Sequence, residues 1–174
     1  MSKWMDHPEQ LILGKTRDLL RLGKSTEHSV VAARMIEQAK LSIDILTRHL
    51  DARVFDQASI IDAIRSLVHE QPRAQVRIIV RDSGPMARNG HRLLQLGQRL
   101  TSFIHIHKLP KPYEDVNEAL LVVDGTAYIR QPMSDQYEAV ASFNDRKQAR
   151  NYADHFEEIW HVSEADIETR RLGI

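Results

Sequence analysis

The chain has 174 residues, of which 42% are hydrophobic and 28% charged, the balance of one ordinary globular domain. It contains no cysteine, which excludes disulfides, thiolate nucleophiles and zinc–cysteine sites and favours a reducing, cytoplasmic location. Because 24 Lys and Arg balance 24 Asp and Glu, a histone-like nucleic-acid binder is not expected. No apolar run is long enough for a secretory signal or a membrane span.

The first half of the chain alternates between helix and strand signals. Residues 8–21 are predicted as a first helix, opened by a proline, and residues 25–40 as a second with apolar positions at helical spacing. Residues 41–46 alternate as a strand does. A helix over 56–71 and a β-branched strand over 76–80 follow.

The second half continues the alternation after an Asp-Ser-Gly-Pro turn. A basic helix is expected over 86–100. Strand signals then fall at residues 102–108, 119–124, 127–129 and 137–143. Asn144 is expected to cap a long helix that runs through Trp160, and Ser163 to cap a short tail helix. These elements predict an α/β fold with a mixed sheet flanked by helices.

Charge is unevenly distributed along this neutral chain. Residues 72–111 carry eight Lys or Arg and one acid, a net charge of +7, whereas residues 112–174 carry six basic and 13 acidic residues, a net charge of −7. Such segments predict charged patches that orient a partner, unless the two sets interleave on the folded surface and cancel.

Two stretches carry a resemblance to a known family. The first is Asn117–Gly125, a buried strand that ends in Asp-Gly after a polar lead-in. The second is the closing strand with Glu138 and its capped helix, which contains Ala149, Tyr152, Phe156 and Trp160. With the preceding strand–helix–strand, this resembles one domain of the phospholipase D superfamily. The resemblance implies a phospholipase D-like domain over 25–162, an N-terminal helical extension over 1–24 and a C-terminal tail helix over 163–174.

The superfamily motif, HxKxxxxD, is altered in this chain. In the family the His forms the phosphohistidine or protonates the leaving group, and the Lys neutralises phosphoryl oxygens. Alignment on Asp124 places Asn117 at the His position and Ala119 at the Lys position, and the family's Gly-Ser-x-Asn segment is absent near residues 130–133. A neutral amide is no useful nucleophile and alanine carries no charge, so the ordinary catalytic site is missing.

Both motif-equivalent polar residues also have local explanations. Asp124 is either a relic of catalysis or the first residue of a tight Asp-Gly turn, and the turn explains it without help. Asn117 is either a hydrogen-bond donor to a phosphate oxygen or a loop residue at a strand entry.

Basic side chains at predicted strand ends and on one helix surface are the remaining candidates. Arg48, His49, Arg77 and Arg81 lie where α/β sheets collect anions, although solvated strand-end charges are the alternative. The basic helix, which also carries Arg99, either tracks a phosphate backbone or pairs with acidic residues of the C-terminal helix. His105 and His107 share one strand face, with no third ligand that indicates a metal. The possible phosphate-binding residues are Arg48, His49, Arg77, Arg81, Arg88, Arg92, His105 and His107.

The predicted function is a non-catalytic phospholipase D-like domain that binds a phosphate-bearing partner, foremost nucleic acid, or another protein. The alternative is a phosphodiesterase or nuclease with an active site rebuilt from His105, His107 and Arg81. A third hypothesis is a pure protein-interaction domain. We expect no cofactor, no metal and no membrane partner. Single-motif superfamily members dimerise around paired motifs, so the resemblance implies a homodimer.

Overall fold

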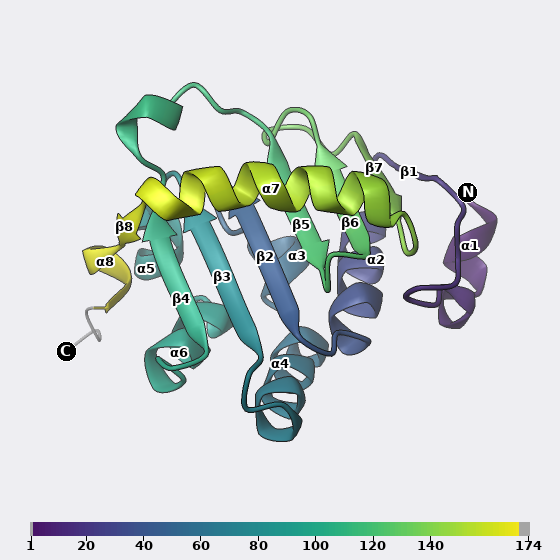
Figure 1. The fold of residues 1–174 in the computed structure, drawn as a ribbon, viewed down its shortest axis with the longest axis horizontal. Coiled ribbons are helices and arrows are strands. Elements are labelled where there is room, and N and C mark those ends of the chain that lie inside the picture. The colour runs from purple at the N-terminus through teal and green to yellow at the C-terminus, as the bar shows by residue number, and fades with distance from the viewer. Residues whose placement is uncertain (1, 171–174) are drawn as a thin grey trace.

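A mixed sheet of eight strands runs through the molecule, in the order β1-β7-β6-β5-β2-β3-β4-β8 (Figure 1). The structure, a computed structural model, describes residues 2–170. β2, β3 and β4 are parallel, and every other neighbouring pair is antiparallel. The strands are β1 (Leu20–Leu22), β2 (Ser42–Thr47), β3 (Gln75–Val80), β4 (Ile104–Lys108), β5 (Ala119–Val123), β6 (Ala127–Gln131), β7 (Ala139–Ser142) and β8 (Glu164–Ala165).

Helices cover both faces of this sheet. The long helix α7 crosses one face diagonally, and the helices between β1 and β4 lie on the other (Figure 1). The predicted α/β fold with a mixed, helix-flanked sheet is therefore confirmed. The helices are α1 (Lys3–Asp6), α2 (Ser25–Glu37), α3 (Ala52–Phe55), α4 (Ala58–Glu70), α5 (Gly84–Asn89), α6 (Arg92–Arg99), α7 (Arg146–Val162) and α8 (Ile167–Arg170), with 3₁₀ turns at Pro8–Gln10 and Lys111–Tyr113.

The core lies between the central strands and these two helix layers. Strands β2, β3 and β5 are buried on both faces, which explains their nearly continuous apolar sequences. No helix among residues 2–170 is both long and apolar enough to cross a bilayer.

The helix expected over residues 8–21 is not formed, and that prediction is wrong. Gly14 adopts a left-handed conformation (φ 80°), and its N–H donates to the carbonyl of Phe143 at 2.8 Å. Leu20 and Leu22 then enter the sheet as β1, antiparallel to β7, and both are buried. The leucines that suggested a helix therefore serve a strand whose partner lies over a hundred residues away.

The basic helix expected over 86–100 is two helices. Gly90 takes a left-handed conformation (φ 73°) that ends α5, and the His91 side chain caps α6 by accepting the N–H of Leu93. Arg88 and Arg92 consequently sit on different helices, and their predicted common surface is not formed.

The ends of α7 also differ from expectation. Asp145, not Asn144, caps the helix, because its carboxylate accepts the N–H of Gln148 at 3.1 Å. Ser163 does not start a tail helix; β8 follows it and α8 begins at Ile167. The expected tail beyond residue 170 lies outside the described residues.

Candidate phosphate-binding cleft

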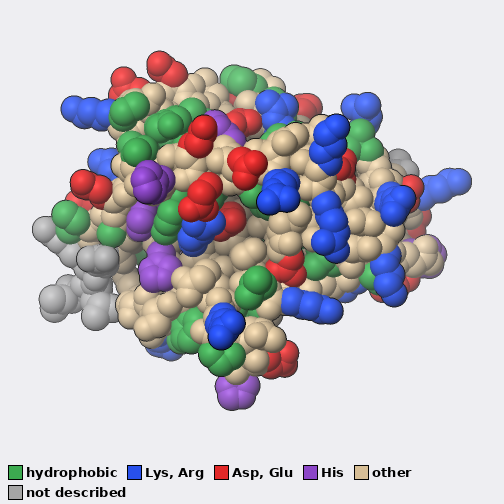
Figure 2. All heavy atoms as spheres, viewed as in Figure 1, with side chains coloured by type: hydrophobic (Ala, Val, Ile, Leu, Met, Phe, Trp, Pro, Cys, Tyr) green, Lys and Arg blue, Asp and Glu red, His purple; other side chains and the backbone are tan. Residues whose placement is uncertain are grey.

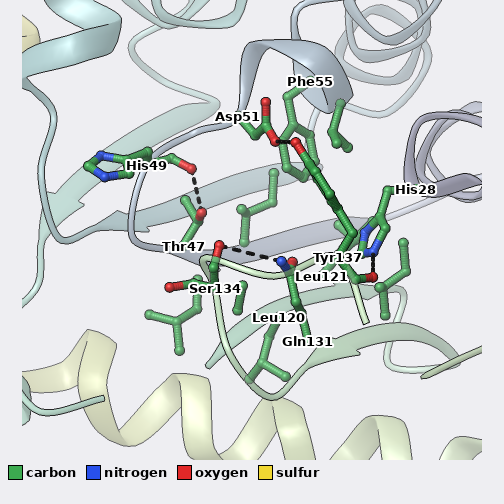
Figure 3. A pocket seen from close by; sticks show the side chains of 15 residues that line it. His28, Thr47, His49, Asp51, Phe55, Leu120, Leu121, Gln131, Ser134 and Tyr137 are labelled. Carbon is green, nitrogen blue, oxygen red and sulfur yellow. Dashed lines mark hydrogen bonds between the residues drawn. The ribbon is translucent and has the colours of Figure 1, made fainter. Parts of the chain in front are cut away.

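A cleft opens where β2 and β3 end, beside the start of β5 and the loop after β6. It consists of an inner pocket of ≈ 50 Å³ and an outer depression of ≈ 370 Å³. The two adjoin, because His49, Asp51, Ser134 and Tyr137 line both (Figure 3). Parallel strands β2 and β3 bring their carboxyl ends to this edge, the usual position of ligand sites in α/β sheets.

The inner pocket has an apolar floor and walls tied by hydrogen bonds. The Tyr137 hydroxyl donates to Asp51 at 2.7 Å, and His28 Nε2 lies 2.6 Å from the Tyr137 carbonyl oxygen (Figure 3). Since a carbonyl only accepts, Nε2 of His28 carries a hydrogen. Burial lowers the pKa of His28, so the ring is neutral at pH 7. Burial, together with the bond to Asp51, raises the pKa of Tyr137.

Basic side chains lie beside residues that line the cleft, and we call this group its rim. Arg48 follows β2 and is exposed, and the neighbouring His49 Nδ1 lies 4.0 Å from Asp82. Arg81 follows β3 and donates to the Asn117 side-chain oxygen at 3.4 Å. These residues combine guanidinium and amide N–H donors at one rim, a set suited to phosphate oxygens.

Arg88, on α5, belongs to the same group, since its neighbour Asn89 lines the outer depression. Its guanidinium folds back over Gly84, so that a Cβ there would lie 2.8 Å from Nη1. The segment between β3 and α5 is joined to the residues after β2, because the Asp82 N–H donates to the Arg48 carbonyl at 2.9 Å.

Asn117 and Ala119 lie at the start of β5. Asn117, just before the strand, is exposed, and its carbonyl accepts the N–H of Ser134 at 2.7 Å, whereas Ala119 lines the inner pocket. Gln131 and Ser134, after β6, line the same pocket and are joined by a hydrogen bond from Gln131 Nε2 to the Ser134 carbonyl (Figure 3). Ala119 contributes neither charge nor a nucleophile to the pocket, whereas the Gln131 amide contributes hydrogen-bonding groups.

Asp124 lies at the opposite end of β5, and its carboxylate anchors the chain. Its oxygens accept the backbone N–H groups of Lys40, Leu41 and Ser42 at 2.7, 2.8 and 2.9 Å. Asp124 also occupies a left-handed turn position (φ 55°). It thus combines the expected turn role with a tether between the β5–β6 hairpin and the entry to β2.

We expect Asp124→Ala to lower the free energy of unfolding by about 3 kcal/mol, because three backbone donors lose an acceptor worth about 1 kcal/mol each. Urea denaturation measures the change. Asp135→Ala is the matched control and should leave stability unchanged, because Asp135 is exposed and its side chain has no hydrogen-bond or ion-pair partner among residues 2–170. Equal stabilities for the two variants would contradict the tether.

Arg77 is not at a strand end, contrary to expectation. It lies in the middle of β3 beneath α7, where it donates to Asp44 at 2.9 Å and to Glu157 at 2.8 Å. Its guanidinium also lies over the rings of Phe156 and Trp160, at 5.1 and 5.3 Å from their centroids. Through these contacts Arg77, on β3, helps to hold α7 on the sheet.

His105 and His107 lie on β4 and have separate contacts. His105 Nε2 lies 3.0 Å from the Gln75 side-chain oxygen. His107 stacks on Trp160, with ring centroids 3.6 Å apart, and its Nδ1 lies 2.7 Å from the Ser163 hydroxyl. The Ser163 hydroxyl also lies 2.8 Å from the Trp160 carbonyl oxygen, to which it can donate.

Arg92, His105 and His107 line neither part of the cleft. Arg92 pairs with Asp56 at 3.3 Å at the start of α6. No group of three or more His, Asp or Glu within residues 2–170 is arranged to hold a metal ion.

Several cleft residues were not predicted. His28 reads as a buried position of an amphipathic helix, and Ser134 and Tyr137 fall in or after an irregular loop. The bond between Asp51 and Tyr137 joins positions 86 residues apart, so no local pattern brings them together. The sequence signal nearest to these residues is the run of polar residues between the strands predicted over 127–129 and 137–143.

The fold is similar to solved structures of low sequence identity. TrmBL2, an archaeal chromatin protein described with a novel mode of DNA binding, matches with a TM-score of 0.60 and 13% identity over 87% of this chain. This chain spans 54% of that protein. Nuc, a phospholipase D family member from Salmonella typhimurium, matches with a TM-score of 0.58 and 20% identity, over 86% of this chain and 99% of Nuc.

NucT from Helicobacter pylori has a TM-score of 0.56 and 13% identity, over 86% of this chain and 98% of NucT. Residues 24–172 match a family model described as "Domain of unknown function (DUF7931)", and no curated protein matches the chain. The structural likeness establishes a phospholipase D-like fold.

Proposed function

This chain belongs to the DUF7931 family and has a phospholipase D-like fold, and from that premise we propose that it is a non-catalytic domain that binds a phosphate-bearing partner, foremost nucleic acid. The contact that supports this most directly is the hydrogen bond from Arg81 to Asn117. It puts a permanent cation beside the residue that aligns with the family's histidine.

Loss of catalysis follows from the two substituted motif positions. We propose that Asn117 and Ala119 replace the motif's His and Lys. An amide neither attacks phosphorus nor shuttles a proton near pH 7, and a methyl group cannot neutralise a phosphoryl oxygen.

Binding is assigned to the rim of the cleft. Arg48, Arg81 and Arg88 supply charge, with His49 and Asn117 as further hydrogen-bonding groups. None of the three arginines has an ion-pair partner among the described residues, so their charges are available to phosphates. A series of rim cations suits a polymer with one charge at each step, and the likeness to a DNA-binding chromatin protein supports nucleic acid.

Fluorescence anisotropy with labelled single-stranded DNA, duplex DNA and RNA tests the proposal. We expect micromolar binding that weakens steeply as salt rises, because bound cations release counterions from the nucleic acid. The same samples, run on a gel after incubation, should contain intact nucleic acid.

The other outcomes identify the alternatives. No binding at low salt would remove nucleic acid and favour a protein partner. Cleavage that is abolished by His105→Ala or His107→Ala would establish an enzyme with a rebuilt site and refute the non-catalytic proposal. Cleavage unaffected by either change and removed by further purification would indicate a contaminant.

A further inference from the structure

A groove of ≈ 220 Å³ lies between α4 and α6, and most of its charged lining is basic. The two helices lie side by side on the face of the sheet opposite α7 (Figure 1). Arg65 of α4 and Arg92 and Arg99 of α6 line the groove, and all three are exposed. Within residues 2–170, Asp62 is the only acidic residue that lines it. The groove therefore has an excess of positive charge.

The connections between the parallel strands determine how the three arginines are arranged. α4 leads from β2 to β3 and α6 leads towards β4, so both helices run against the direction of these strands and parallel to each other. Their starts are level, because Arg92, the first residue of α6, pairs with Asp56, just before α4, at 3.3 Å. Arg65 and Arg99 each lie seven residues, about 10.5 Å, beyond the start of their helix. They therefore lie at the same level of the groove, on opposite sides of it.

Ion pairs within the chain leave much of this charge available. The Arg99 side chain makes no hydrogen bond or ion pair within residues 2–170. Arg65 Nη1 lies 3.8 Å from Asp62, but both side chains are more than half exposed, and such surface pairs are weak. Arg92 meets Asp56 through Nε. The guanidinium groups of Arg65 and Arg99 are therefore available to an anion in the groove.

The rest of the lining indicates which part of a ligand the groove holds. Ala58, Ile61 and Leu96 supply apolar walls, and no aromatic side chain of the described residues lines the groove, so a base has no ring to stack on. The volume is below the about 300 Å³ at which pockets for whole small molecules begin. Guanidinium groups, in contrast, bind phosphate oxygens through two hydrogen bonds at once. The groove therefore suits phosphate groups of a ligand whose other parts lie outside it.

The groove adjoins the candidate cleft. Asp56 and His91 line the outer depression of the cleft. Arg92 follows His91, binds Asp56 and lines the groove. A chain that leaves the outer depression at this point meets Arg92 first, and meets Arg65 and Arg99 about 10.5 Å further along.

We infer that this groove is a second phosphate-binding site, which binds the backbone of the same nucleic-acid strand that the rim of the cleft binds. The inference rests on the proposed function and adds to it a course for the strand and two contact residues, Arg65 and Arg99. Because the groove holds phosphates and no base, its contacts are independent of base sequence. A strand too short to reach from the rim to the groove lacks these contacts.

Strand length and charge removal together test the inference by fluorescence anisotropy. The wild type should bind oligothymidine of about 16 nucleotides more tightly than oligothymidine of about 4 nucleotides. Arg65→Ala/Arg99→Ala should weaken binding of the longer strand at least ten-fold and make its salt slope shallower by about 1.4, at about 0.7 for each lost phosphate contact. It should leave binding of the shorter strand unchanged. Arg48→Ala/Arg81→Ala, at the rim, should weaken binding of both strands.

Arg146→Ala/Arg150→Ala is the matched control, because it removes the same charge from two exposed arginines on the other face of the sheet. Both lie in the N-terminal half of α7, over which Figure 2 shows Lys and Arg gathered. This control should leave the affinities for both strands near wild type. Arg65 and Arg99 are also exposed, so the groove variant should fold, and urea denaturation checks that it does.

The contrary outcomes separate this inference from the proposed function. If neither strand binds the wild type, both are refuted. If the groove variant binds the longer strand as tightly as the wild type does, the inference is refuted while binding at the rim stands. Equal losses for the two strands in the groove variant, or an equal loss in the matched control, would also refute a course that only the longer strand reaches.

Inorganic pyrophosphate distinguishes a strand from a small phosphate ligand. Titrated into the protein and followed by calorimetry, it should bind the wild type and bind the groove variant at least ten-fold more weakly, since the groove recognises phosphate groups. It should also compete with the longer strand. If pyrophosphate binds in this way but the longer strand binds both proteins equally, the groove is a site for a small phosphate ligand and the inferred course of the strand is wrong.

Discussion

Arg77→Met is expected to lower the free energy of unfolding by about 3–5 kcal/mol, because it leaves a buried carboxylate without its partner. The Asp44 side chain is 8% exposed, and Arg77 is its ion-pair partner. The same change removes the contacts of the guanidinium with Phe156 and Trp160, which join α7 to β3.

The loss of stability in Arg77→Met should depend on pH. Burial raises the pKa of Asp44, and Arg77 opposes that rise, so the variant's carboxyl should have a still higher pKa. A group whose pKa is higher in the folded than in the unfolded state lowers the free energy of unfolding at pH values above its folded pKa. This destabilisation decreases as the pH falls through that value. The deficit should therefore be largest near neutral pH and smaller in mild acid.

Urea denaturation of the wild type and the variant, near neutral pH and again in mild acid, measures the difference in their free energies of unfolding. The double variant Asp44→Leu/Arg77→Met removes both charges and should recover most of the loss. Arg73→Met, an exposed arginine just before the same strand, should change stability by less than about 0.5 kcal/mol. A deficit that is identical at both pH values would show that an unpaired Asp44 is not its source.

Arg48→Ala/Arg81→Ala is expected to reduce affinity for single-stranded DNA at least ten-fold. If each arginine contacts one phosphate, the slope of log K against log salt should become shallower by about 1.4, at about 0.7 for each lost contact. Neither side chain is buried, and within the described residues the Arg81 side chain makes one hydrogen bond, of 3.4 Å, to Asn117, so folding should be unaffected.

Anisotropy titrations over several salt concentrations measure both quantities. Arg73→Ala removes an exposed arginine at the other end of β3, and it should leave affinity and slope near wild type. If Arg73→Ala weakens binding as much as the double variant, the interaction is diffuse attraction to the whole surface and the cleft is not the binding site.

Much of the fold was predictable because its signals are local. The central strands β2, β3 and β5 are short, apolar and bounded by turn residues, and α7 has a clear apolar stripe. Residues 8–21 were misread because leucines at irregular spacing suit a helix as well as a loop followed by an edge strand. The pairing of Leu20 with Ala141 decides between them, and it is not local.

The candidate site residues that could be predicted are those whose positions follow from the boundaries and order of the strands. Arg48, Arg81 and Asn117 were expected at strand boundaries, and the structure brings them to one edge of the sheet. Arg77 was misplaced because nothing near it in sequence shows that Asp44 and Glu157 bind it. Ion pairs between distant elements form only when the layers are stacked.

The first strand has a consequence for where this domain starts. The family match begins at residue 24, but β1 (Leu20–Leu22) already pairs with β7 along the sheet margin. A chain shortened to the matched region would expose the backbone N–H and C=O groups of β7 and uncover the apolar surface that Leu20 and Leu22 bury. Unprotected edges of this kind promote aggregation between molecules. The unit that folds therefore extends beyond the unit that sequence comparison delimits.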